Sequence, residues 1–356
     1  EVLTFAKTAT KKDSVYWEKI RPVPLTLEEI KDYTIKDSIK VIRKSKKYLD
    51  SLDTKRNKLG WFDPITGYTF RNSYKDWSIS YNGPLLKTSF NPVQGFHSSA
   101  GIRYFKRQND TGKWWSLGVN VNYGFADKRA RPTLFFSKKW NNISRPRISI
   151  TGGVKTAQFN DRDSFLLANN AFSALFDKDN YLKIYEKSFA QISFSNEIKN
   201  GIFLNTSLEY ANRKPLFNTT DFSFKNKAFR YTSNNPLDET DYTNAAFTEH
   251  RIAKLRIGAR FVFGQKYLSY PNRKFNIGND KYPTLNLIYR KTFGAQNSEL
   301  NSDVLIGRLN QEIKTGNYGR LSYNLRGGLF FKKKQIAFMD YFHPNGNQFT
   351  FPLDIS

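Results

Sequence analysis

Cysteine is absent from the 356-residue chain, histidine occurs three times and methionine once. A chain without cysteine has no disulfide, no thiolate metal site and no cysteine nucleophile. The three histidines, His97, His250 and His343, are far apart in the sequence and match no metal-binding spacing such as HExxH. We therefore expect no metal, no cofactor and no enzymatic activity.

Long apolar runs are also missing. The mean hydropathy is −0.62, and no segment approaches the ~18 consecutive apolar residues that a membrane helix needs. The first residues, Glu1 to Thr4, have neither the basic nor the apolar part of a signal peptide. The last residues, Leu353 to Ser356, lack the aromatic end of a closing strand. We expect a chain that was processed or trimmed at its start and truncated at its end.

Acidic residues are scarce relative to basic ones. The chain has 57 Lys and Arg against 31 Asp and Glu, a formal net charge of +26. Residues 1–60 contribute +6 of this and the remainder +20, so the charge is not confined to a basic tail. A surface of this sign attracts nucleic acid, or the phosphates of anionic lipid and lipopolysaccharide. Solvated loops are the alternative location for much of it.

What the sequence has in abundance is alternation between apolar and polar residues. From Trp115 to Phe125 every odd position is large and apolar, and every even position is Ser, Gly or Asn. Successive side chains of a strand point to opposite faces, so this segment has one apolar and one polar face. Ten long segments of this kind are predicted at residues 96–106, 114–125, 133–140, 147–156, 188–198, 201–212, 251–263, 283–292, 304–313 and 319–331, and a shorter strand at 77–81.

The lengths of these segments indicate where the apolar faces point. Strands of soluble proteins average ~5–6 residues, whereas strands that cross a bilayer at a tilt need ~9–11. Short connections at residues 199–200 and 314–318 contrast with long ones at 157–187 and 213–250, as in barrels with turns on one side and loops on the other. We predict an all-β fold, an antiparallel transmembrane β-barrel of about ten or more strands, incomplete in this chain. The connection from Gln265 to Tyr282 is too long for a turn and has no explanation in the sequence.

Residues 1–60 differ from the rest. Thr26 and Glu29 form a capping-box pattern at the start of one helix, and apolar residues recur at helical spacing in residues 37–54. We predict two short helices. The domains expected are a periplasmic helical segment or linker at residues 1–60 and an outer-membrane barrel at 61–356.

Alternation assigns side chains to the two faces of this barrel. The residues expected to face lipid are Leu117, Val119, Val121, Tyr123, Leu204, Leu208 and Leu325. The aromatic residues expected at the membrane interface are Trp114, Trp115 and Trp140. The residues expected to make a basic lumen are Arg103, Arg256, Arg260, Arg290 and Arg326. These arginines would bind or guide anions, unless they pair with inward carboxylates such as Glu209 and Glu312.

Three other interpretations stay open. In a soluble sandwich the same apolar faces would form a core, at the cost of long unprotected edge strands. A soluble basic β-protein would bind nucleic acid or another polyanion with an affinity that falls steeply with salt. A barrel hydrolase would need a serine beside a histidine. Only His97 and Ser99 share a face at that spacing, which is weak support.

Several segments resemble a family of Bacteroidota outer-membrane proteins of unknown function. The resemblance is carried by Trp17-Glu18-x-x-Arg21-Pro22-x-Pro24-Leu25-Thr26-x-x-Glu29, then Tyr33, Lys36-Asp37-Ser38, Asn91-x-Val93-x-Gly95-Phe96, Tyr267-x-Ser269-Tyr270-Pro271, Tyr282-Pro283-Thr284 and Phe351-Pro352-Leu353. Members of the family typically carry a carboxypeptidase-regulatory-like β-domain ahead of the first motif, which this chain lacks. The family is distantly similar to BamA-type surface-antigen barrels, and this implies about sixteen strands.

The function we expect is that of an integral, non-enzymatic outer-membrane barrel that acts in protein assembly, translocation or surface scaffolding within a larger complex. The expected partners are outer-membrane lipid, lipopolysaccharide and other outer-membrane or periplasmic proteins, with nucleic acid disfavoured. The expected location is the outer membrane of a Gram-negative, Bacteroidota bacterium.

Overall fold

The computed structural model describes residues 3–4, 8, 12–108, 111–160, 167–225, 230–278, 281–294 and 296–341. Its largest part is a 13-stranded sheet. The strands of this sheet are β2 (Tyr68–Asn72), β3 (Trp77–Asn82), β4 (Ser89–Asn91), β5 (Gly95–Gln108), β6 (Lys113–Gly124), β7 (Arg129–Lys139), β8 (Arg147–Gln158), β9 (Ile184–Lys199), β10 (Ile202–Pro215), β11 (His250–Val262), β14 (Thr284–Gly294), β15 (Ser302–Lys314) and β16 (Arg320–Phe331).

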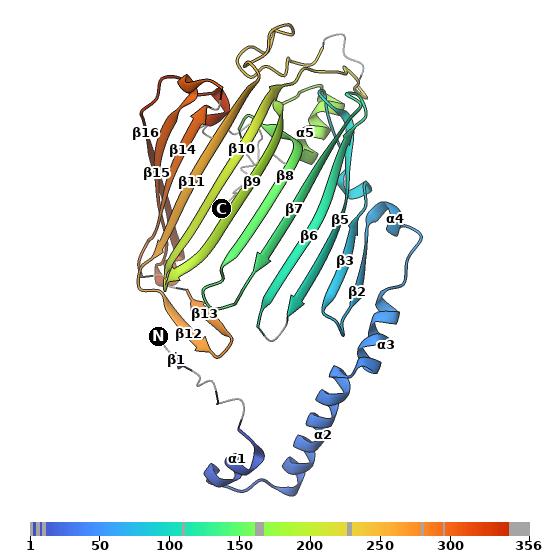
Figure 1. Ribbon diagram of the computed structural model, residues 1–356, viewed down its shortest axis with the longest axis vertical. Coiled ribbons are helices and arrows are strands. Elements are labelled where there is room, and N and C mark those ends of the chain that lie inside the picture. Colours follow the sequence, from blue (N-terminus) through green and yellow to red (C-terminus); the bar gives the residue numbers. More distant parts are fainter. Residues whose placement is uncertain are drawn as a thin grey trace.

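Neighbouring strands of this sheet are antiparallel, and nearly all are consecutive in the chain. The order runs from β16 through β15, β14, β11, β10, β9, β8, β7, β6 and β5 to β3 and β2, while β4 pairs with the start of β5. The ten long strands and the shorter one predicted from alternation are all present. The sheet curls around on itself (Figure 1), but in the described part of the chain its edge strands β2 and β16 do not pair, so it is open.

The connections are of unequal length at the two ends of the sheet. Long connections, residues 159–183 and 216–249, lie at the end where β5 begins, and the first contains α5 (Leu167–Phe172) and η2 (Ser173–Asp177). At the opposite end, β9 and β10 are joined by two residues, and β15 and β16 by five that include η4 (Gly316–Tyr318). We call these the loop end and the turn end; Figure 1 shows them at the top and the bottom.

The connection from Gln265 to Tyr282 is explained by a second, smaller sheet. It forms a hairpin of β12 (Lys266–Tyr270) and β13 (Arg273–Ile277), and the N-terminal β1 (Leu3–Thr4) pairs with β12 in parallel. The hairpin is fastened to the main sheet by Glu197 at the end of β9, which accepts hydrogen bonds from Lys274 and Asn276. The extra length therefore builds an element of its own at the turn end.

Helices occupy the N-terminal segment, with bounds that differ from those predicted. They are α1 (Ser14–Ile20), α2 (Leu27–Lys44), α3 (Lys46–Arg56) and α4 (Asp63–Thr66). The Thr26–Glu29 capping box is confirmed at the start of α2. Ser45 ends α2 and caps α3 through its hydroxyl, so the predicted single helix at 37–54 is divided there. Asp53 of α3 binds the backbone N–H and the hydroxyl of Ser73, which attaches α3 to the β2–β3 turn.

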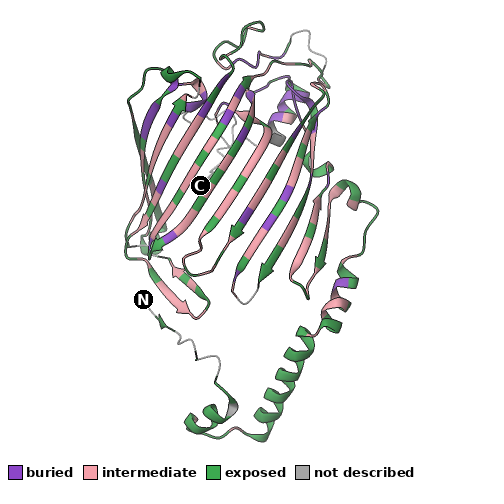
Figure 2. Ribbon diagram, in the orientation of Figure 1, coloured by how far each residue is buried: buried purple, intermediate pink, exposed green. Residues whose placement is uncertain are grey.

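Burial is concentrated at the loop end. Phe90 of β4 packs with Ala174, Leu175 and Tyr231, which come from both long connections. In a second buried cluster, Phe159 and Tyr185 pack with Met339, which belongs to η5 (Phe338–Asp340). Figure 2 shows most buried positions at this end, while the turn end and the helices are largely exposed. The two long connections and η5 therefore form a cap over one end of the sheet.

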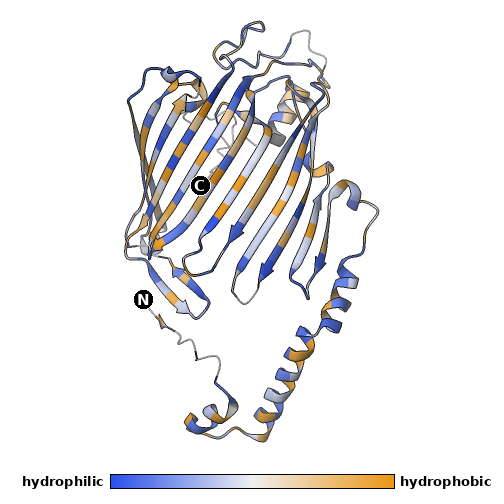
Figure 3. Ribbon diagram, in the orientation of Figure 1, coloured by the Kyte–Doolittle hydropathy of each residue, from blue (hydrophilic) through white to orange (hydrophobic). Residues whose placement is uncertain are grey.

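Hydrophobic and hydrophilic residues alternate along the strands, as the bands of Figure 3 show. Because successive side chains point to opposite faces, the two faces of the sheet differ in chemistry. We call the face that contacts α5 and η5 the inner face and the opposite one the outer face. One row of directly opposed outer residues crosses nine strands and contains only apolar, aromatic or glycine residues: Tyr81, Ile102, Val119, Leu134, Gly152, Ala190, Tyr210, Ala253 and Phe293. Among the described residues, none of the helices is both long and apolar enough to cross a membrane.

Candidate functional site on the inner face

The five arginines predicted to line a lumen lie on the inner face. Arg256 of β11 stands directly opposite Arg290 of β14. Arg260 shares a row with Arg326 that crosses β14 and β15. Arg103 lies apart from the other four, on β5, with its guanidinium 5.4 Å from the ring centre of Phe105. The register therefore brings four of the five together on β11, β14 and β16.

These arginines do not pair with the carboxylates considered from the sequence. Glu209 binds Lys187 at 2.8 Å, and Glu312 binds Arg320 at 3.0 Å. Arg256 instead donates to the amide oxygen of Asn205 at 3.2 Å. The guanidinium of Arg260 lies 4.2 Å from the ring centre of Phe203. Both arginines thus contact neutral groups.

The residues predicted to face lipid all lie on the outer face. Leu117, Leu208 and Leu325 are 50%, 49% and 62% exposed. The other four are Val119, Val121, Tyr123 and Leu204, on the same face of β6 and β10.

The three tryptophans predicted at an interface are distributed over both faces. Trp115 points outward and packs with Tyr104, their ring centres 4.9 Å apart. Trp114, its neighbour in the chain, points inward, where it contacts Phe105 and Arg147. Adjacent residues of a strand cannot share a face, so Trp114 does not belong with the outward aromatic residues. Trp140 follows the end of β7, beneath the ammonium of Lys138.

A cluster of buried charges on the inner face surrounds Asp340, which the sequence did not single out. Arg213 of β10 donates to both oxygens of Asp340, at 2.8 and 3.1 Å, and Lys254 of β11 pairs with it as well. Arg290 adds a 2.8 Å hydrogen bond to the backbone oxygen of Asp340. Burial raises the pKa of Asp340, and the charges of Lys254 and Arg213 more than reverse this, holding it well below its usual range. The segment after β16 is thereby fixed to three strands.

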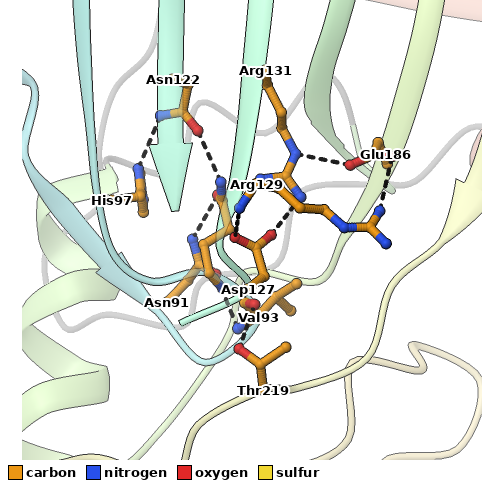
Figure 4. A network of polar contacts seen from close by, with 10 residues as sticks. Asn91, Val93, His97, Asn122, Asp127, Arg129, Arg131, Glu186 and Thr219 are labelled. Carbon is orange, nitrogen blue, oxygen red and sulfur yellow. Dashed lines mark hydrogen bonds and ion pairs between the residues drawn. The ribbon is translucent and has the colours of Figure 1, made fainter. Parts of the chain in front are cut away.

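A second polar network joins β4, β5, β6 and β7 at the loop end (Figure 4). Asn91 accepts backbone hydrogen bonds from Val93 and Gln94, and the Gln94 amide donates to Asn122 of β6 at 2.8 Å. Asn122 in turn donates to Ser99 at 2.9 Å. These contacts fix the 91–95 turn, which contains part of the resemblance motif at residues 91–96.

Arg131 extends this network to β9. Its side chain is 1% exposed and pairs with Asp127 and with Glu186, the latter at 2.9 Å. Arg129 binds the other oxygen of Glu186 at 3.3 Å. Thr219 of the second long connection donates to the backbone oxygen of Val93 at 2.8 Å, so the connection is tied to the same turn.

A cavity of about 830 Å³ lies between this network and the cap. Its polar wall includes His97, Asn122 and Arg131, and its apolar wall includes Phe172 and Leu175. The weak hydrolase interpretation required His97 and Ser99 to act together. Both instead contact the Asn122 side chain, at 3.4 and 2.9 Å. In the described part of the chain no three His, Asp or Glu residues gather as a metal site.

Comparison with known proteins gives a family and no activity. A protein-family model described as "Family of unknown function (DUF5686) C-terminal domain" matches residues 62–355. No curated protein and no solved structure matches the chain.

Proposed function

The chain belongs to this family of unknown function, and we propose that it is an integral, non-enzymatic β-barrel protein of a Gram-negative outer membrane. In this proposal the outer face meets lipid and the inner face lines a capped interior. The Bacteroidota origin rests on the resemblance of the sequence motifs alone.

The apolar outer face is the observation that carries the proposal. A second outer row crosses seven strands through Tyr104, Leu117, Phe136, Ile150, Ile192, Leu208 and Leu255. Soluble monomers rarely expose contiguous apolar patches larger than a few hundred Å². The strands contain 11 to 16 residues from β5 to β11 and from β14 to β16, which is enough for the ~9–11 needed to cross a bilayer at a tilt.

Within the membrane we propose a part in protein assembly, translocation or surface scaffolding, inside a larger complex. Two features of the turn end support a partner there. The helix α2 has no buried residue, and exposes Ile35, Ile39 and Ile42 along its length. The β12–β13 hairpin projects from the same end. Lipid, lipopolysaccharide and other envelope proteins are the partners that this arrangement favours.

A cysteine scan tests the proposal, because the chain has no cysteine of its own. Leu208→Cys places a label on the outer face of β10, and Ser207→Cys places it on the inner face one residue away. Each variant is labelled with a polarity-sensitive fluorophore and reconstituted in phospholipid vesicles. We expect brominated lipid to quench the label at position 208 and to leave the label at 207 unaffected.

One result of this experiment would contradict the proposal. A chain that stays monomeric in buffer without detergent, with both labels reporting water, contradicts the membrane proposal. The remaining candidate would then be a soluble basic β-protein that binds polyanions, which the positive inner face favours. Its mark is an affinity that falls steeply with salt.

A further inference from the structure

A second hollow, of about 460 Å³, opens on the inner face toward the turn end. Its walls include Arg145 from the β7–β8 connection, Asn205 of β10, Arg256 and Arg260 of β11, and Asn286 of β14. Hollows of roughly 300–1,000 Å³ hold small ligands. It is separate from the cap cavity, with which it shares no lining residue.

The floor of this hollow is Gly258. It lies between Arg256 and Arg260 on the same face of β11, because side chains two apart in a strand point the same way. A Cβ atom at this position would come no closer than 3.5 Å to another atom. The space above Gly258 therefore has room for a further atom in ordinary van der Waals contact. The two arginines flank it at Cα positions about 13 Å apart.

Four charged residues line the hollow: three arginines, Arg145, Arg256 and Arg260, and one carboxylate, Glu197. The strands β11, β14 and β16 contain no Asp or Glu, and β15 contains only Asp303 and Glu312. Those two bind Lys291 and Arg320. Glu197 also lines the hollow, but it is 4% exposed and already binds Lys274.

The three arginines of the hollow make neutral contacts instead. Arg145 donates to the backbone oxygen of Lys274 at 2.7 Å, Arg256 to Asn205, and Arg260 lies over Phe203. Arg256 also stands directly opposite Arg290, and like charges at opposed positions destabilise a sheet. An anion in the hollow would relieve that repulsion.

We propose that this hollow binds a small ligand with two or more phosphate groups, held by Arg145, Arg256 and Arg260. The planar fork of arginine matches the oxygens of a phosphate and donates two parallel hydrogen bonds to it. The guanidinium groups of Arg256 and Arg260, on either side of Gly258, suit a ligand with two separate phosphates better than a single ion. The source is either a soluble diphosphate or the phosphorylated headgroup of a lipid, which share this chemistry.

The experiment titrates the full chain in detergent micelles with inorganic pyrophosphate, short-chain diacylglycerol pyrophosphate and citrate, by calorimetry. We expect saturable binding of a phosphate compound that weakens with added salt and is tighter than that of citrate. Tighter binding of diacylglycerol pyrophosphate identifies a lipid headgroup, and tighter binding of inorganic pyrophosphate identifies a soluble ligand.

Variants locate the site. Arg256→Gln and Arg260→Gln should each weaken binding about tenfold or more, since hydrogen bonds to charged groups are the strong ones. Gly258→Leu should abolish binding by filling the floor without changing charge. The matched control Arg320→Gln removes an arginine that is 67% exposed and paired with Glu312, and should leave the affinity within about twofold.

Three results would overturn the proposal. They are the absence of saturable binding, tighter binding of citrate than of both phosphates, and an equal loss in Arg320→Gln and Arg260→Gln. The arginine variants are surface changes on the inner face, so they remain informative if Gly258→Leu fails to fold. Binding in micelles is also independent of the lipid-quenching result, which keeps this proposal distinguishable from the membrane one.

Discussion

Asp340 and Arg213 form a bidentate ion pair although 127 residues separate them in the chain. Both side chains are nearly inaccessible to solvent, at 4% and 2% exposed. Since Asp340 follows the last strand of the sheet and Arg213 lies in its middle, this pair draws the end of the described chain back across the inner face.

Asp340→Asn should release the segment after β16. Removing one partner of a buried ion pair leaves the other charge uncompensated, which costs about 3–5 kcal/mol, and here Arg213 and Lys254 both lose their carboxylate. We expect a lower unfolding midpoint in denaturant and faster limited proteolysis after Lys334. The matched control is Glu312→Gln, which breaks an exposed pair and should cost no more than about 1 kcal/mol. Equal effects of the two variants would contradict the anchoring role.

Tyr231 should make the cap sensitive to alkaline pH. Its hydroxyl lies 2.5 Å from the carbonyl oxygen of Ala174 and 2.8 Å from that of Phe222, and burial raises its pKa to about 12. An unfolded tyrosine ionises near pH ~10. The stability that the neutral hydroxyl contributes is therefore complete below that pH and is lost as the pH rises toward 12.

Limited proteolysis of the cap across this pH range measures the effect. Tyr231→Phe should remove the dependence, while Tyr242→Phe, a variant of an exposed neighbour that bonds the Tyr231 backbone, should keep it. A cap that resists cleavage equally at pH 9 and 12 would show that Tyr231 does not control it.

Glu197→Gln should loosen the attachment of the β12–β13 hairpin to the main sheet, which Arg145 and Asn142 also hold through the backbone of Lys274. The Glu197 side chain is 1% exposed and holds Lys274 of β13, so its loss leaves a buried ammonium without a counter-charge. We expect faster amide exchange throughout the hairpin and unchanged exchange in β5 and β6. Uniform acceleration across the sheet would instead mean that Glu197 supports the whole fold.

Gly153→Ala should disturb the junction of β7 and β8. Gly153 has φ +135°, and a Cβ there would lie 2.1 Å from the carbonyl oxygen of Pro132. The paired register of β7 and β8 ends at this residue, and strain of this kind costs about 1–3 kcal/mol. Gly327→Ala, where a Cβ meets nothing within 4 Å, is the control and should leave the unfolding midpoint nearly unchanged.

The long strands were predictable because both their faces follow a strict period of two. Alternation such as that of residues 115–125 places each side chain on one face, and the pairing of neighbours follows from short connections. The predicted assignment of Leu208 and Arg256 to opposite faces rests on this alone, and the register places them on opposite faces of the sheet. The prediction of an all-β fold is confirmed, whereas the barrel, predicted to be incomplete in this chain, stays a prediction because the described sheet is open and its edge strands β2 and β16 do not pair.

The elements that the sequence missed depend on contacts between distant segments. The β1 strand has two residues and exists only through its pairing with β12. Asp340 has no local pattern, because its partners Arg213, Lys254 and Arg290 lie 127, 86 and 50 residues away. The break between α2 and α3 at Ser45 was also missed, but a local signal could have predicted it, because serine is a preferred residue at the start of a helix.

The unequal edges of the sheet limit how it can be completed. The edge strand β16 has twelve residues and the opposite edge β2 only five, about 40 and 17 Å of extended chain. If β16 paired directly with β2, seven residues of β16 would have no backbone hydrogen-bond partners on that side. A closed barrel with fully paired edges therefore needs at least one further strand between β16 and β2. That strand must be long enough to pair with the whole of β16, and so it extends beyond β2 on its other side.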